Sequence, residues 1–479
     1  MIILRIPNWL GDAVNSTSIL YNLMDNKNEV TLLMKRYVFP IFKHIDGVRK
    51  IVLSERISED IKYIRRLKAE IGFLFTPSFS SALEFFLGGV KKRVGYATDF
   101  RRLLLSDAKK PFKKGELHIV EEYRKLILPY VENKYPYPIF IKGYFKKPLM
   151  GTIGIDTGSI FGEAKNWDFD RYKKVSEYFV EMGYRVVQIG RERRKKLVDS
   201  KMVENLSGET KLEELIDVIS TLQIFISGDT GSMHIASALR IPQIAIFTST
   251  SPEWTGPLNP YSIVLRNGVD CSPCYKRKCP YGNYRCREIP TESIIASARR
   301  LIKNTENLRP VAFLDRDGTL NKEKGYIRNP DEVELLPGIV EGLKYLHKKK
   351  FLLIVTTNQS GIKRGITRED DVVKVNKKLE ELLKNKGIKL DGIYYSPDLP
   401  NSGSLSRKPA TGMVDQALNM FPIDRGRMVV VGDKEEDIEL ARRIGGIGVL
   451  VLTGHGRETE KIISPDYKIE EFNDITEIF

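Results

Sequence analysis

Apolar and polar positions alternate along this chain with two different periods. Short apolar runs rich in β-branched residues are separated by longer stretches whose apolar positions recur at helical spacing. This order is typical of parallel sheets joined by crossover helices, so we expect an α/β protein throughout. The predicted strands are 2–6, 29–34, 71–75, 152–155, 185–189, 224–227, 243–247, 311–314, 352–356, 392–395, 428–431 and 448–452.

Two segments interrupt this alternation and predict the domain boundaries. Residues 142–151 follow neither period and precede a new strand, and residues 304–310 form a second linker. The expected units are therefore 1–147, 148–305 and 306–479.

The charge of the chain is uneven, and it narrows the range of partners. The 479 residues carry a net charge of +15, of which +16 lies in the first 305 residues and −1 in the remainder. Such a field attracts phosphorylated substrates, an anionic membrane surface or nucleic acid, and charge alone does not choose among them. Because no apolar run approaches the roughly 20 residues that span a bilayer, we expect a cytoplasmic protein.

The last third of the chain carries polar side chains at predicted strand ends. Asp315 and Asp317 directly follow the strand at 311–314, on the loop where parallel sheets build their sites. Asp and Gly are also common turn residues, so this pair alone is equally compatible with a solvated turn. Three further motifs follow in order and make the turn interpretation much weaker: Thr356-Thr-Asn-Gln359, Arg407-Lys408-Pro409 and Gly432-Asp433-Lys-Glu-Glu-Asp437.

Together these motifs resemble the haloacid dehalogenase-like (HAD) phosphatases over roughly residues 310–456. The resemblance implies a Rossmann-like domain with a parallel sheet, in which Asp315 attacks phosphorus while Asp317 protonates the leaving oxygen and later activates water. It also implies that Asp315, Asp433 and the backbone carbonyl of Asp317 hold Mg²⁺, a hard cation that prefers oxygen ligands. The phosphate-binding residues are then Thr357, Asn358, Arg407 and Lys408, with Asp437 as a supporting carboxylate.

Longer sequence motifs in this region resemble one particular branch of the HAD phosphatases. Asp315-Arg-Asp-Gly-Thr-Leu-Asn321 and Arg407-Lys-Pro-Ala-Thr-Gly-Met413 look like the heptose 1,7-bisphosphate 7-phosphatase and histidinol-phosphatase branch. That branch usually carries a zinc loop, C-x-H followed by C-x-C, just before the Arg-Lys-Pro motif. Serine is a poor zinc ligand, so we expect a metal-free loop and leave the choice of substrate open. The residues at the four places are Ser396, Asp398, Ser404 and Ser406.

The front of the chain carries motifs at its own predicted strand ends. The first strand runs into Pro7-Asn-Trp-Leu-Gly-Asp12-Ala13, which by itself favours a plain βα turn with Asp12 as the helix cap. Five further motifs change that picture, and the set resembles the ADP-heptose:lipopolysaccharide heptosyltransferases of glycosyltransferase family 9 over about residues 1–302. The resemblance implies the GT-B fold, in which two Rossmann-like lobes face a cleft. The motifs are Gly158-Ser-Ile-Phe-Gly-Glu-Ala-Lys165-Asn-Trp167, Ile189-Gly190-Arg-Glu192, Gly208-Glu-Thr210-Lys-Leu-Glu213, Ser227-Gly-Asp229-Thr230-Gly231-Ser232-Met-His234 and Ser249-Thr-Ser-Pro-Glu-Trp-Thr-Gly-Pro257.

The resemblance assigns roles to these motifs. The segment Asp229-Thr230-Gly231 opens a helix after a strand, so its backbone N–H groups and the Thr230 hydroxyl can hold a nucleotide pyrophosphate. Lys165 would neutralise the diphosphate leaving group, so that no metal is essential, and Asp12 would be the general base for the acceptor hydroxyl in an inverting transfer. By resemblance, Glu192 contacts the ribose or base of ADP and His234 lines the same pocket. A capping or packing role explains either of these two residues equally well.

All four cysteines fall within sixteen residues, as C-x2-C-x4-C-x6-C. The spacing of Cys271, Cys274, Cys279 and Cys286 leaves open a structural Zn²⁺ tetrathiolate, two disulfides, an iron–sulfur cluster or free thiols. Neighbouring cations can meet an anionic acceptor or the inner leaflet of the membrane, and a solvated basic loop accounts for them as well. None of these interpretations makes the cysteines catalytic.

The two resemblances together predict a bifunctional enzyme. It would transfer heptose from ADP-heptose to the lipopolysaccharide core at the inner membrane surface and hydrolyse a heptose bisphosphate with Mg²⁺. An alternative keeps the transferase and gives the phosphatase histidinol phosphate or another small sugar phosphate. Nucleic-acid binding is a distant alternative, because the basic residues are scattered over helices without stacking aromatics, and we expect no nucleic-acid partner. The oligomeric state is not predicted.

Overall fold

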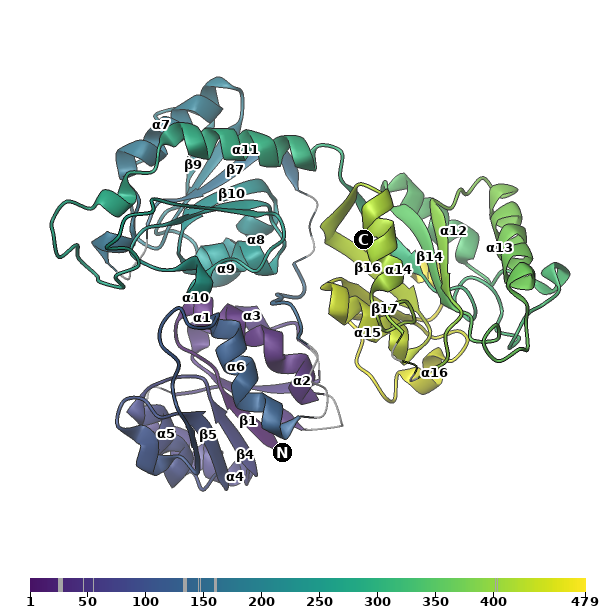
Figure 1. Ribbon diagram of the computed structural model, residues 1–479, viewed down its shortest axis with the longest axis horizontal. Coiled ribbons are helices and arrows are strands. Elements are labelled where there is room, and N and C mark those ends of the chain that lie inside the picture. Colours follow the sequence, from purple (N-terminus) through teal and green to yellow (C-terminus); the bar gives the residue numbers. More distant parts are fainter. Residues whose placement is uncertain are drawn as a thin grey trace. The chain divides into compact units, whose positions relative to one another are not determined.

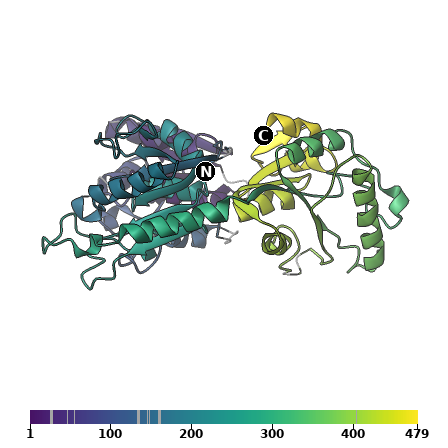
Figure 2. The same ribbon diagram turned by 90° about the horizontal axis from the view of Figure 1, so that it is seen from above.

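The computed structural model divides the chain into two compact units, Met1–Thr305 and Glu306–Phe479 (Figure 1 and Figure 2). Residue 147, where the first predicted unit ends, and residues 159–161 of the glycine-rich motif lie outside the described residues. The structure describes residues 1–24, 29–45, 47–54, 56–131, 136–144, 146, 148–158, 162–400, 402 and 404–479.

The first unit begins with a parallel sheet in the strand order β3-β2-β1-β4-β5-β6. Its central strand β1 (Ile2–Arg5) is buried on both faces, because Ile2 and Leu4 pack with one apolar cluster and Ile3 with another. The other strands are β2 (Val30–Met34), β3 (Val48–Val52), β4 (Ile71–Leu74), β5 (Lys92–Tyr96) and β6 (Asp107–Lys109). The helices are α1 (Leu10–Asn15), α2 (Leu20–Met24), α3 (Phe39–Phe42), α4 (Ile57–Leu67), α5 (Phe79–Leu87) and α6 (Ile119–Ile127).

A second parallel sheet follows in the same unit, in the order β12-β11-β10-β7-β8-β9. Its strand β10 (Leu222–Gly228) is buried over its whole length and leads into α9 (Gly231–Ala238). The other strands are β7 (Leu149–Asp156), β8 (Arg185–Ile189), β9 (Val203–Asn205), β11 (Gln243–Phe247) and β12 (Ser262–Arg266). The other helices are α7 (Phe169–Glu181), α8 (Leu212–Ser220), α10 (Pro252–Thr255) and α11 (Thr291–Thr305).

The second unit contains a third parallel sheet, in the order β15-β14-β13-β16-β17-β18. The connections change direction between β13 (Arg309–Leu314) and β16 (Ile423–Gly432), and ligands of open α/β sheets bind at such a switch point. The other strands are β14 (Leu352–Asn358), β15 (Gly392–Ser396), β17 (Ile447–Val451) and β18 (Tyr467–Ile469). The helices are α12 (Ile339–Lys348), α13 (Glu369–Lys384), α14 (Gly412–Met420), α15 (Glu435–Ile444) and α16 (Gly456–Thr459).

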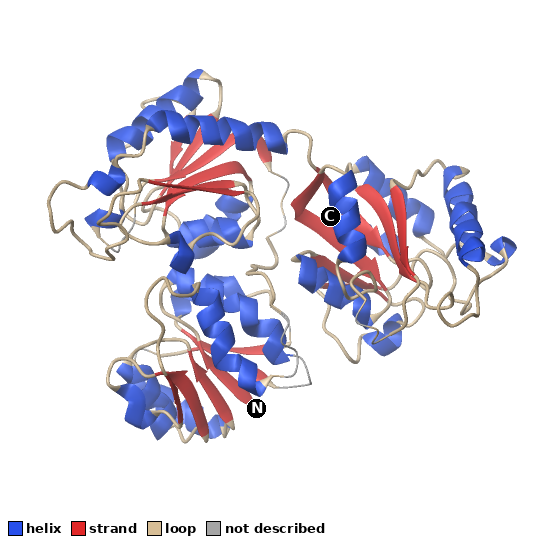
Figure 3. Ribbon diagram, viewed as in Figure 1, coloured by secondary structure: helices blue, strands red, loops and turns tan. Residues whose placement is uncertain are grey.

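Three all-parallel sheets with helices on their faces confirm the predicted α/β class (Figure 3). Every predicted strand is present, and six further strands, β3, β5, β6, β9, β12 and β18, were not predicted. Five of these six lie at sheet edges, where one side has no neighbouring strand and the sequence is less apolar. In the described part of the chain, no helix combines the length and the hydropathy needed to cross a membrane.

Candidate active sites

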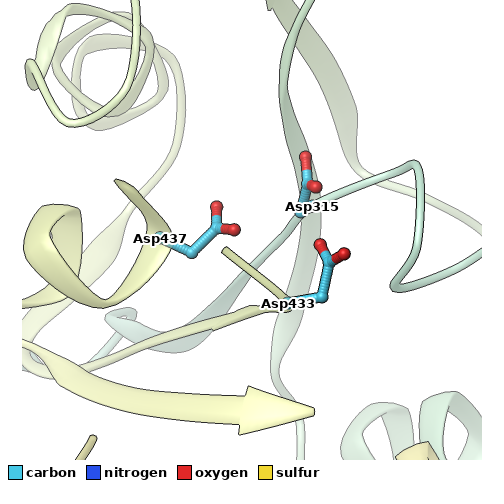
Figure 4. Close-up of side chains that lie close together, drawn as sticks. All are labelled: Asp315, Asp433 and Asp437. Atoms are coloured by element: carbon cyan, nitrogen blue, oxygen red, sulfur yellow. The ribbon is translucent and has the colours of Figure 1, made fainter. Parts of the chain in front are cut away.

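The C-terminal unit gathers three carboxylates at the switch point of its sheet (Figure 4). Asp315 follows β13, Asp433 follows β16, and Asp437 lies in the first turn of α15. All three residues are buried, and one carboxylate oxygen from each lies within 4.8 Å of the other two. Within the described ranges, this is the one group of three or more His, Cys, Asp or Glu side chains close enough to share a metal ion.

Two of these carboxylates have raised pKa values because they are buried close to other negative charges. Burial, followed by the negative charge of Asp315, raises the pKa of Asp433, and burial also raises the pKa of Asp437 against the opposing charge of Lys408. A cation between the carboxylates would relieve this repulsion. Because the donors are hard carboxylate oxygens, the group fits Mg²⁺.

Lys408 lies beside two of the three carboxylates. Its Nζ is 2.7 Å from Oδ1 of Asp315 and 2.5 Å from Oδ1 of Asp437. Burial opposes the charge of Lys408, but the two carboxylates outweigh it and raise the lysine pKa. A charged lysine therefore orients Asp315 at the position that the phosphatase resemblance gives to the nucleophile.

A second cation at this site was not predicted from the sequence. Lys434 follows Asp433 directly, and the charges of Asp315 and Asp433 raise its pKa in spite of burial. Its Nζ lies 3.0 Å from Oε2 of Glu323. The position next to a motif aspartate was the one signal in the sequence that could have pointed to it.

Asp317 is placed differently from the three clustered carboxylates. Its carboxylate accepts hydrogen bonds from Arg316 (Nη2, 2.7 Å), Asn321 (Nδ2, 3.0 Å) and Gln359 (Nε2, 2.9 Å). Burial works against ionisation, but the Arg316 charge and these hydrogen bonds lower the pKa of Asp317 overall. Its side chain is thus ionised and held by three neighbouring side chains.

Three of the predicted phosphate-binding residues, Asn358, Thr357 and Arg407, form hydrogen bonds within the protein. Asn358 holds the backbone of Lys408, because Lys408 N donates to Asn358 Oδ1 (2.9 Å) and Asn358 Nδ2 donates to Lys408 O (3.2 Å). Thr357 is buried at the end of β14, and its Oγ1 accepts a hydrogen bond from Gln359 Nε2 at 2.9 Å. Arg407 donates through Nη1 to Asp398 O at 3.1 Å, so it is tied to the preceding loop.

Two glycines form a wall of the carboxylate site. Gly318 has φ +85°, and a Cβ there would lie 2.3 Å from Oδ2 of Asp433. Gly454 has φ +52°, and its Cβ would lie 2.2 Å from the same oxygen. Both positions therefore require glycine, for backbone conformation and for space.

The loop expected to lack a metal is held by hydrogen bonds around one carboxylate. Asp398 Oδ2 accepts from the hydroxyls of Ser404 (2.5 Å), Ser406 (3.3 Å) and Ser396 (3.5 Å). Ser404 Oγ in turn accepts from the backbone N–H of Arg407 at 3.2 Å. The cluster therefore cross-links the chain immediately before Lys408.

In the first unit, α1 and α9 meet at the ends of the two sheets. A Cβ on Gly11 would lie 2.5 Å from Cδ2 of His234, and a Cβ on Gly231 would lie 2.7 Å from Cδ2 of Leu10. Glycine at both positions lets the two helices approach closely. The contact brings Asp12, in the first turn of α1, towards the residues that follow β10.

Asp12, Lys165 and Asp229 influence one another electrostatically. Burial raises the pKa of Asp12 to about 6, with Lys165 opposing and Asp229 adding to the shift. Lys165 Nζ lies 2.7 Å from Oδ2 of Asp229. A carboxylate with a pKa close to neutral pH suits a general base.

Asp229 is surrounded by donors. Its Oδ2 accepts hydrogen bonds from the hydroxyls of Thr250 (2.7 Å) and Thr255 (3.3 Å), in addition to the ion pair with Lys165. The carboxylate is buried. This environment suits a residue that orients Lys165 better than one that faces a nucleotide phosphate.

Thr230 caps α9. Its Oγ1 accepts from Met233 N at 3.4 Å and lies 2.6 Å from Oγ of Ser232, which donates to the buried Asp156. The N-terminus of α9, with Gly231 as its first residue, lies at the carboxyl end of β10, where backbone N–H groups and the helix dipole favour an anion.

The structure gives Glu192 and His234 different surroundings. His234 is buried, burial lowers its pKa to about 4, and its Nδ1 has no hydrogen-bond partner. It is therefore a neutral ring packed on Gly11. Glu192 is exposed on the loop after β8, and its ion pair with Arg194 spans 4.0 Å, so it is not brought into the Asp12 group.

Glu122 is a candidate that sequence reasoning missed. It lies on α6, and its Oε1 accepts a hydrogen bond from Trp254 Nε1 at 3.1 Å. Burial raises the pKa of Glu122 to about 7, and the charge of Asp12 adds to the shift. In the sequence, Glu122 looks like any other polar position of an amphipathic helix. Only its contact with Trp254 in the folded chain distinguishes it from the other polar residues of α6.

The four cysteines are unpaired thiols in the structure. All four line one cavity, together with Ala164 and Ser249. They lie between β12 and α11, next to the segment that carries Lys165.

The two units are similar to two different families of known proteins. The family model "Glycosyltransferase family 9 (heptosyltransferase)" matches residues 60–285, and a HAD-hydrolase-like model matches residues 405–475. The solved structure of Escherichia coli ADP-heptose lipopolysaccharide heptosyltransferase II aligns with TM-score 0.53 and 22% identity, covering 64% of this chain and 99% of that one. A family 9 glycosyl transferase from Veillonella parvula aligns with TM-score 0.52 and 17% identity, covering 63% and 97%. These similarities establish a shared fold and confirm the predicted GT-B arrangement.

The last third of the chain matches curated relatives over nearly their whole length. The D-glycero-D-manno-heptose-1,7-bisphosphate 7-phosphatase of Thermosynechococcus vestitus is 38% identical over 179 residues, which cover 34% of this chain and 91% of the relative. The corresponding phosphatase of Escherichia coli K12 is 36% identical over 175 residues, which cover 35% and 91%. The chain therefore belongs, through its C-terminal unit, to the D-glycero-D-manno-heptose-1,7-bisphosphate 7-phosphatase family, joined here to a glycosyltransferase family 9 heptosyltransferase domain.

Proposed function

We propose that this chain is a bifunctional enzyme of lipopolysaccharide core heptose metabolism. Its C-terminal unit removes the 7-phosphate of D-glycero-D-manno-heptose 1,7-bisphosphate, and its first unit transfers heptose from ADP-heptose to the lipopolysaccharide inner core. The observation that carries the proposal is the cluster of Asp315, Asp433 and Asp437, with Lys408 bridging two of its members, in a unit whose relatives are named for this phosphatase activity.

In the phosphatase reaction, Asp315 acts as the nucleophile. Lys408 holds its carboxylate, which attacks phosphorus and forms an aspartyl-phosphate as the sugar oxygen leaves. Asp317 protonates that oxygen and then takes a proton from the water that hydrolyses the aspartyl-phosphate. The lowered pKa of Asp317 suits its role as the base that takes a proton from water. A bound phosphate dianion would raise this pKa and so favour the protonated form, which donates a proton to the leaving oxygen.

The metal-binding residues of this unit follow from the same geometry. Asp315, Asp433 and the backbone carbonyl of Asp317 would hold Mg²⁺, with Asp437 beside them. When bound, the ion neutralises charge on the transferring phosphoryl group. Thr357 and Lys408 are placed to bind phosphoryl oxygens, whereas Asn358 and Arg407 fix the loop that carries Lys408.

In the transferase reaction, Asp12 takes the proton of the acceptor hydroxyl. The hydroxyl oxygen attacks the anomeric carbon of the donor from the side opposite ADP, which leaves with inversion of configuration. Lys165, oriented by Asp229, neutralises the diphosphate, and the N-terminus of α9 at Gly231 adds backbone donors. No metal is needed for this step.

The remaining residues of the transferase site have supporting roles. The exposed Glu192 is available for the ribose or base of ADP, and His234 forms a neutral wall beside Asp12. We place the acceptor at the inner leaflet of the cytoplasmic membrane. The +16 charge of the first 305 residues supports attraction to such an anionic surface.

Phosphate release tests the proposal. The full-length chain is assayed with Mg²⁺ on the heptose 1,7-bisphosphate and, in parallel, on histidinol phosphate, sugar monophosphates and ADP. Strong preference for the bisphosphate is the expected result, and ADP-heptose is then tested as the donor. Preference for histidinol phosphate would keep the phosphatase chemistry and contradict a fusion within one pathway.

A further inference from the structure

One side of the first sheet exposes large apolar side chains that neither proposed reaction uses. Phe100 and Leu103 are 96% and 91% exposed, the highest values among the large hydrophobic residues of the described ranges. Phe79, Phe86 and Leu87, all on α5, are between 42% and 46% exposed. Single exposed apolar residues are normal, but five on neighbouring elements point to an interaction surface. We call these five residues the apolar patch.

The two elements that carry the apolar patch lie side by side. The 3₁₀ helix η4 (Arg101–Leu104) leads into Leu105, which belongs to the same apolar cluster as Phe85 of α5. At the start of α5, Phe79 N donates a hydrogen bond to Oδ2 of Asp99 at 2.7 Å, which ties the helix to the loop before η4. Figure 1 shows α5 beside β5, the strand that precedes this loop. The patch is therefore one continuous surface.

The period of η4 explains why two of these side chains protrude. A 3₁₀ helix has about three residues per turn, so residues three apart lie on the same side. Arg101 is buried and Leu104 packs against the core, whereas Phe100 and Leu103, one position earlier in each case, face water. Nε of Arg101 donates to the backbone oxygen of Tyr96 at 2.9 Å and anchors the turn. The exposure of Phe100 and Leu103 is thus imposed by the fold.

The polarity of α5 is unusual for a helix on the surface of a domain. Its one charged residue, Glu84, is buried, and its Oε2 lies 3.4 Å from Nε of Arg5. The next two apolar positions but one, Phe86 and Leu87, face water. A surface helix normally turns its charged residues outwards and its apolar residues inwards. The outer side of α5 therefore suits contact with an apolar phase.

Cations surround the apolar patch and contact its members. The guanidinium carbon of Arg93 lies 5.2 Å from the ring centroid of Phe86, and Nη2 of Arg65 donates to the backbone oxygen of Leu87 at 2.9 Å. Between residues 88 and 106 the chain has five basic residues and one acidic residue. The surface is thus apolar at its centre and positive at its rim. The rim cations are Arg65, Lys91, Arg93 and Arg102.

We propose that the apolar patch and its rim dock this chain on an anionic lipid bilayer. Phe100 and Leu103 enter the boundary between headgroups and acyl chains, and the rim cations bind lipid phosphates. A bilayer deforms around two side chains that protrude almost completely. A stable protein partner needs about 800 Å² of matched surface on each side.

The docking surface begins at the same edge of the sheet as Asp12. The strand β4, which precedes α5, pairs with β1, and β5, which precedes η4, pairs with β4. Parallel strands end at one edge, so Phe79 and Phe100 start from the edge at which Asp12 follows β1. Docking brings this edge to the membrane, where a lipid-anchored acceptor lies; this consequence rests on the proposed function, whereas the docking surface does not.

Vesicle binding is the first test. Full-length protein is sedimented with vesicles of phosphatidylcholine alone and of phosphatidylcholine mixed with phosphatidylglycerol. We expect binding to the anionic vesicles that weakens as salt is raised. Phe100→Ser/Leu103→Ser should bind them about a hundredfold more weakly, because each apolar side chain contributes about tenfold. The matched control is Leu149→Ser/Met150→Ser, at two exposed apolar positions of β7, and should bind like the wild type.

Charge reversal is the second test, and its two variants have the same net charge. Lys91→Glu/Arg102→Glu changes the rim, and Lys276→Glu/Lys278→Glu changes exposed positions of the basic cysteine-containing loop. We expect the first variant to bind anionic vesicles about tenfold more weakly or worse, and the second to bind nearly like the wild type. Equal losses would overturn the proposal, because net charge and not this surface would then govern binding.

Three other results would also overturn the proposal. One is a wild-type chain that binds no anionic vesicles, and another is unchanged binding by Phe100→Ser/Leu103→Ser. The third concerns a second copy of the chain as the occupant of the patch. Analytical ultracentrifugation would then show a wild-type dimer that dissociates in this variant, with no effect on vesicle binding.

A final assay separates the docking surface from the transferase assignment. Heptosyl transfer is measured on a deacylated, water-soluble acceptor and on the acylated acceptor embedded in vesicles. We expect Phe100→Ser/Leu103→Ser to match the wild type on the soluble acceptor and to be slower on the embedded one. Equal rates on the embedded acceptor would refute a role of docking in transfer. Vesicle binding without transfer to either acceptor would count against the transferase proposal and support the docking surface alone.

Discussion

The two active sites differ in how they are assembled. The proposed phosphatase site lies at the switch point of one sheet, where Asp315, Asp433 and Lys408 come together within a single unit. The proposed transferase site needs the ends of two sheets, because Asp12 follows β1 whereas Asp229 follows β10. The first site is thus built by the fold of one domain, and the second depends on the contact between α1 and α9.

This difference has a physical consequence for the two sites. Within one sheet, parallel strands end at the same edge, so residues after adjacent strands are close by construction. Between two lobes, a close approach requires matching surfaces, and Gly11 and Gly231 provide them. We therefore expect the phosphatase to respond mainly to changes of its own side chains, and the transferase also to changes at the helix contact.

The largest expected effect separates the two activities. Asp315→Asn removes the nucleophile, so phosphate release should fall about ten-thousandfold or more. Heptosyl transfer by the same preparation should remain at the wild-type rate. Parallel assays of both reactions measure this, and loss of both activities would contradict the picture of independent sites.

A slightly smaller effect is expected for the base of the transferase. Asp12→Asn should slow heptosyl transfer about a thousandfold and leave phosphate release unchanged. Because the pKa of Asp12 is raised to about 6 and the base must be ionised, transfer by the wild type should rise with pH through about 6. A variant that transfers at the wild-type rate would exclude Asp12 as the base.

The orientation of Lys165 should have an intermediate effect. Asp229→Asn keeps the shape but removes the charge, so transfer should slow roughly tenfold to a hundredfold. Thr255→Val, which removes the longer of the two threonine hydrogen bonds to Asp229, is the matched control and should have a smaller effect. Equal effects of the two substitutions would show that the charge of Asp229 does not matter.

The contact between α1 and α9 predicts that a second substitution can partly restore the activity lost by the first. A Cβ at Gly11 would lie 2.5 Å from the His234 ring, so Gly11→Ala should lower transfer about tenfold by separating α1 from α9. Combining it with His234→Ala should restore part of the rate. Steady-state kinetics of the two single variants and the double variant measure the coupling, and purely additive losses would rule out this contact as the cause.

The smallest expected effect concerns the serine-rich loop of the phosphatase. Asp398→Ala removes the acceptor shared by three serines, so stability should fall by about 1–2 kcal/mol and phosphate release by a few-fold. Thermal unfolding and phosphate release together measure this. Unchanged values in both assays would show that the loop is held by other contacts.

The sequence by itself determined the α/β class and the central strands of all three sheets. Strands buried on both faces are continuous apolar runs, and their pattern is strong. Edge strands such as β3 (Val48–Val52) contain only partly buried and exposed residues and carry no comparable signal. Asp315 and Asp433 were predictable for the same reason, since they directly follow the central strands β13 and β16, whereas Lys408 lies in the loop between β15 and α14.

Only the tertiary structure decided which side chains meet. Asp437 joins the carboxylate cluster from a helix, and Glu122 contacts Trp254 and is influenced by the charge of Asp12, although neither arrangement is visible in a linear motif. The ion pair of Asp229 with Lys165 likewise joins residues more than sixty positions apart. Sequence patterns record local burial and backbone conformation, whereas charge pairing across segments depends on distances that only the folded chain fixes.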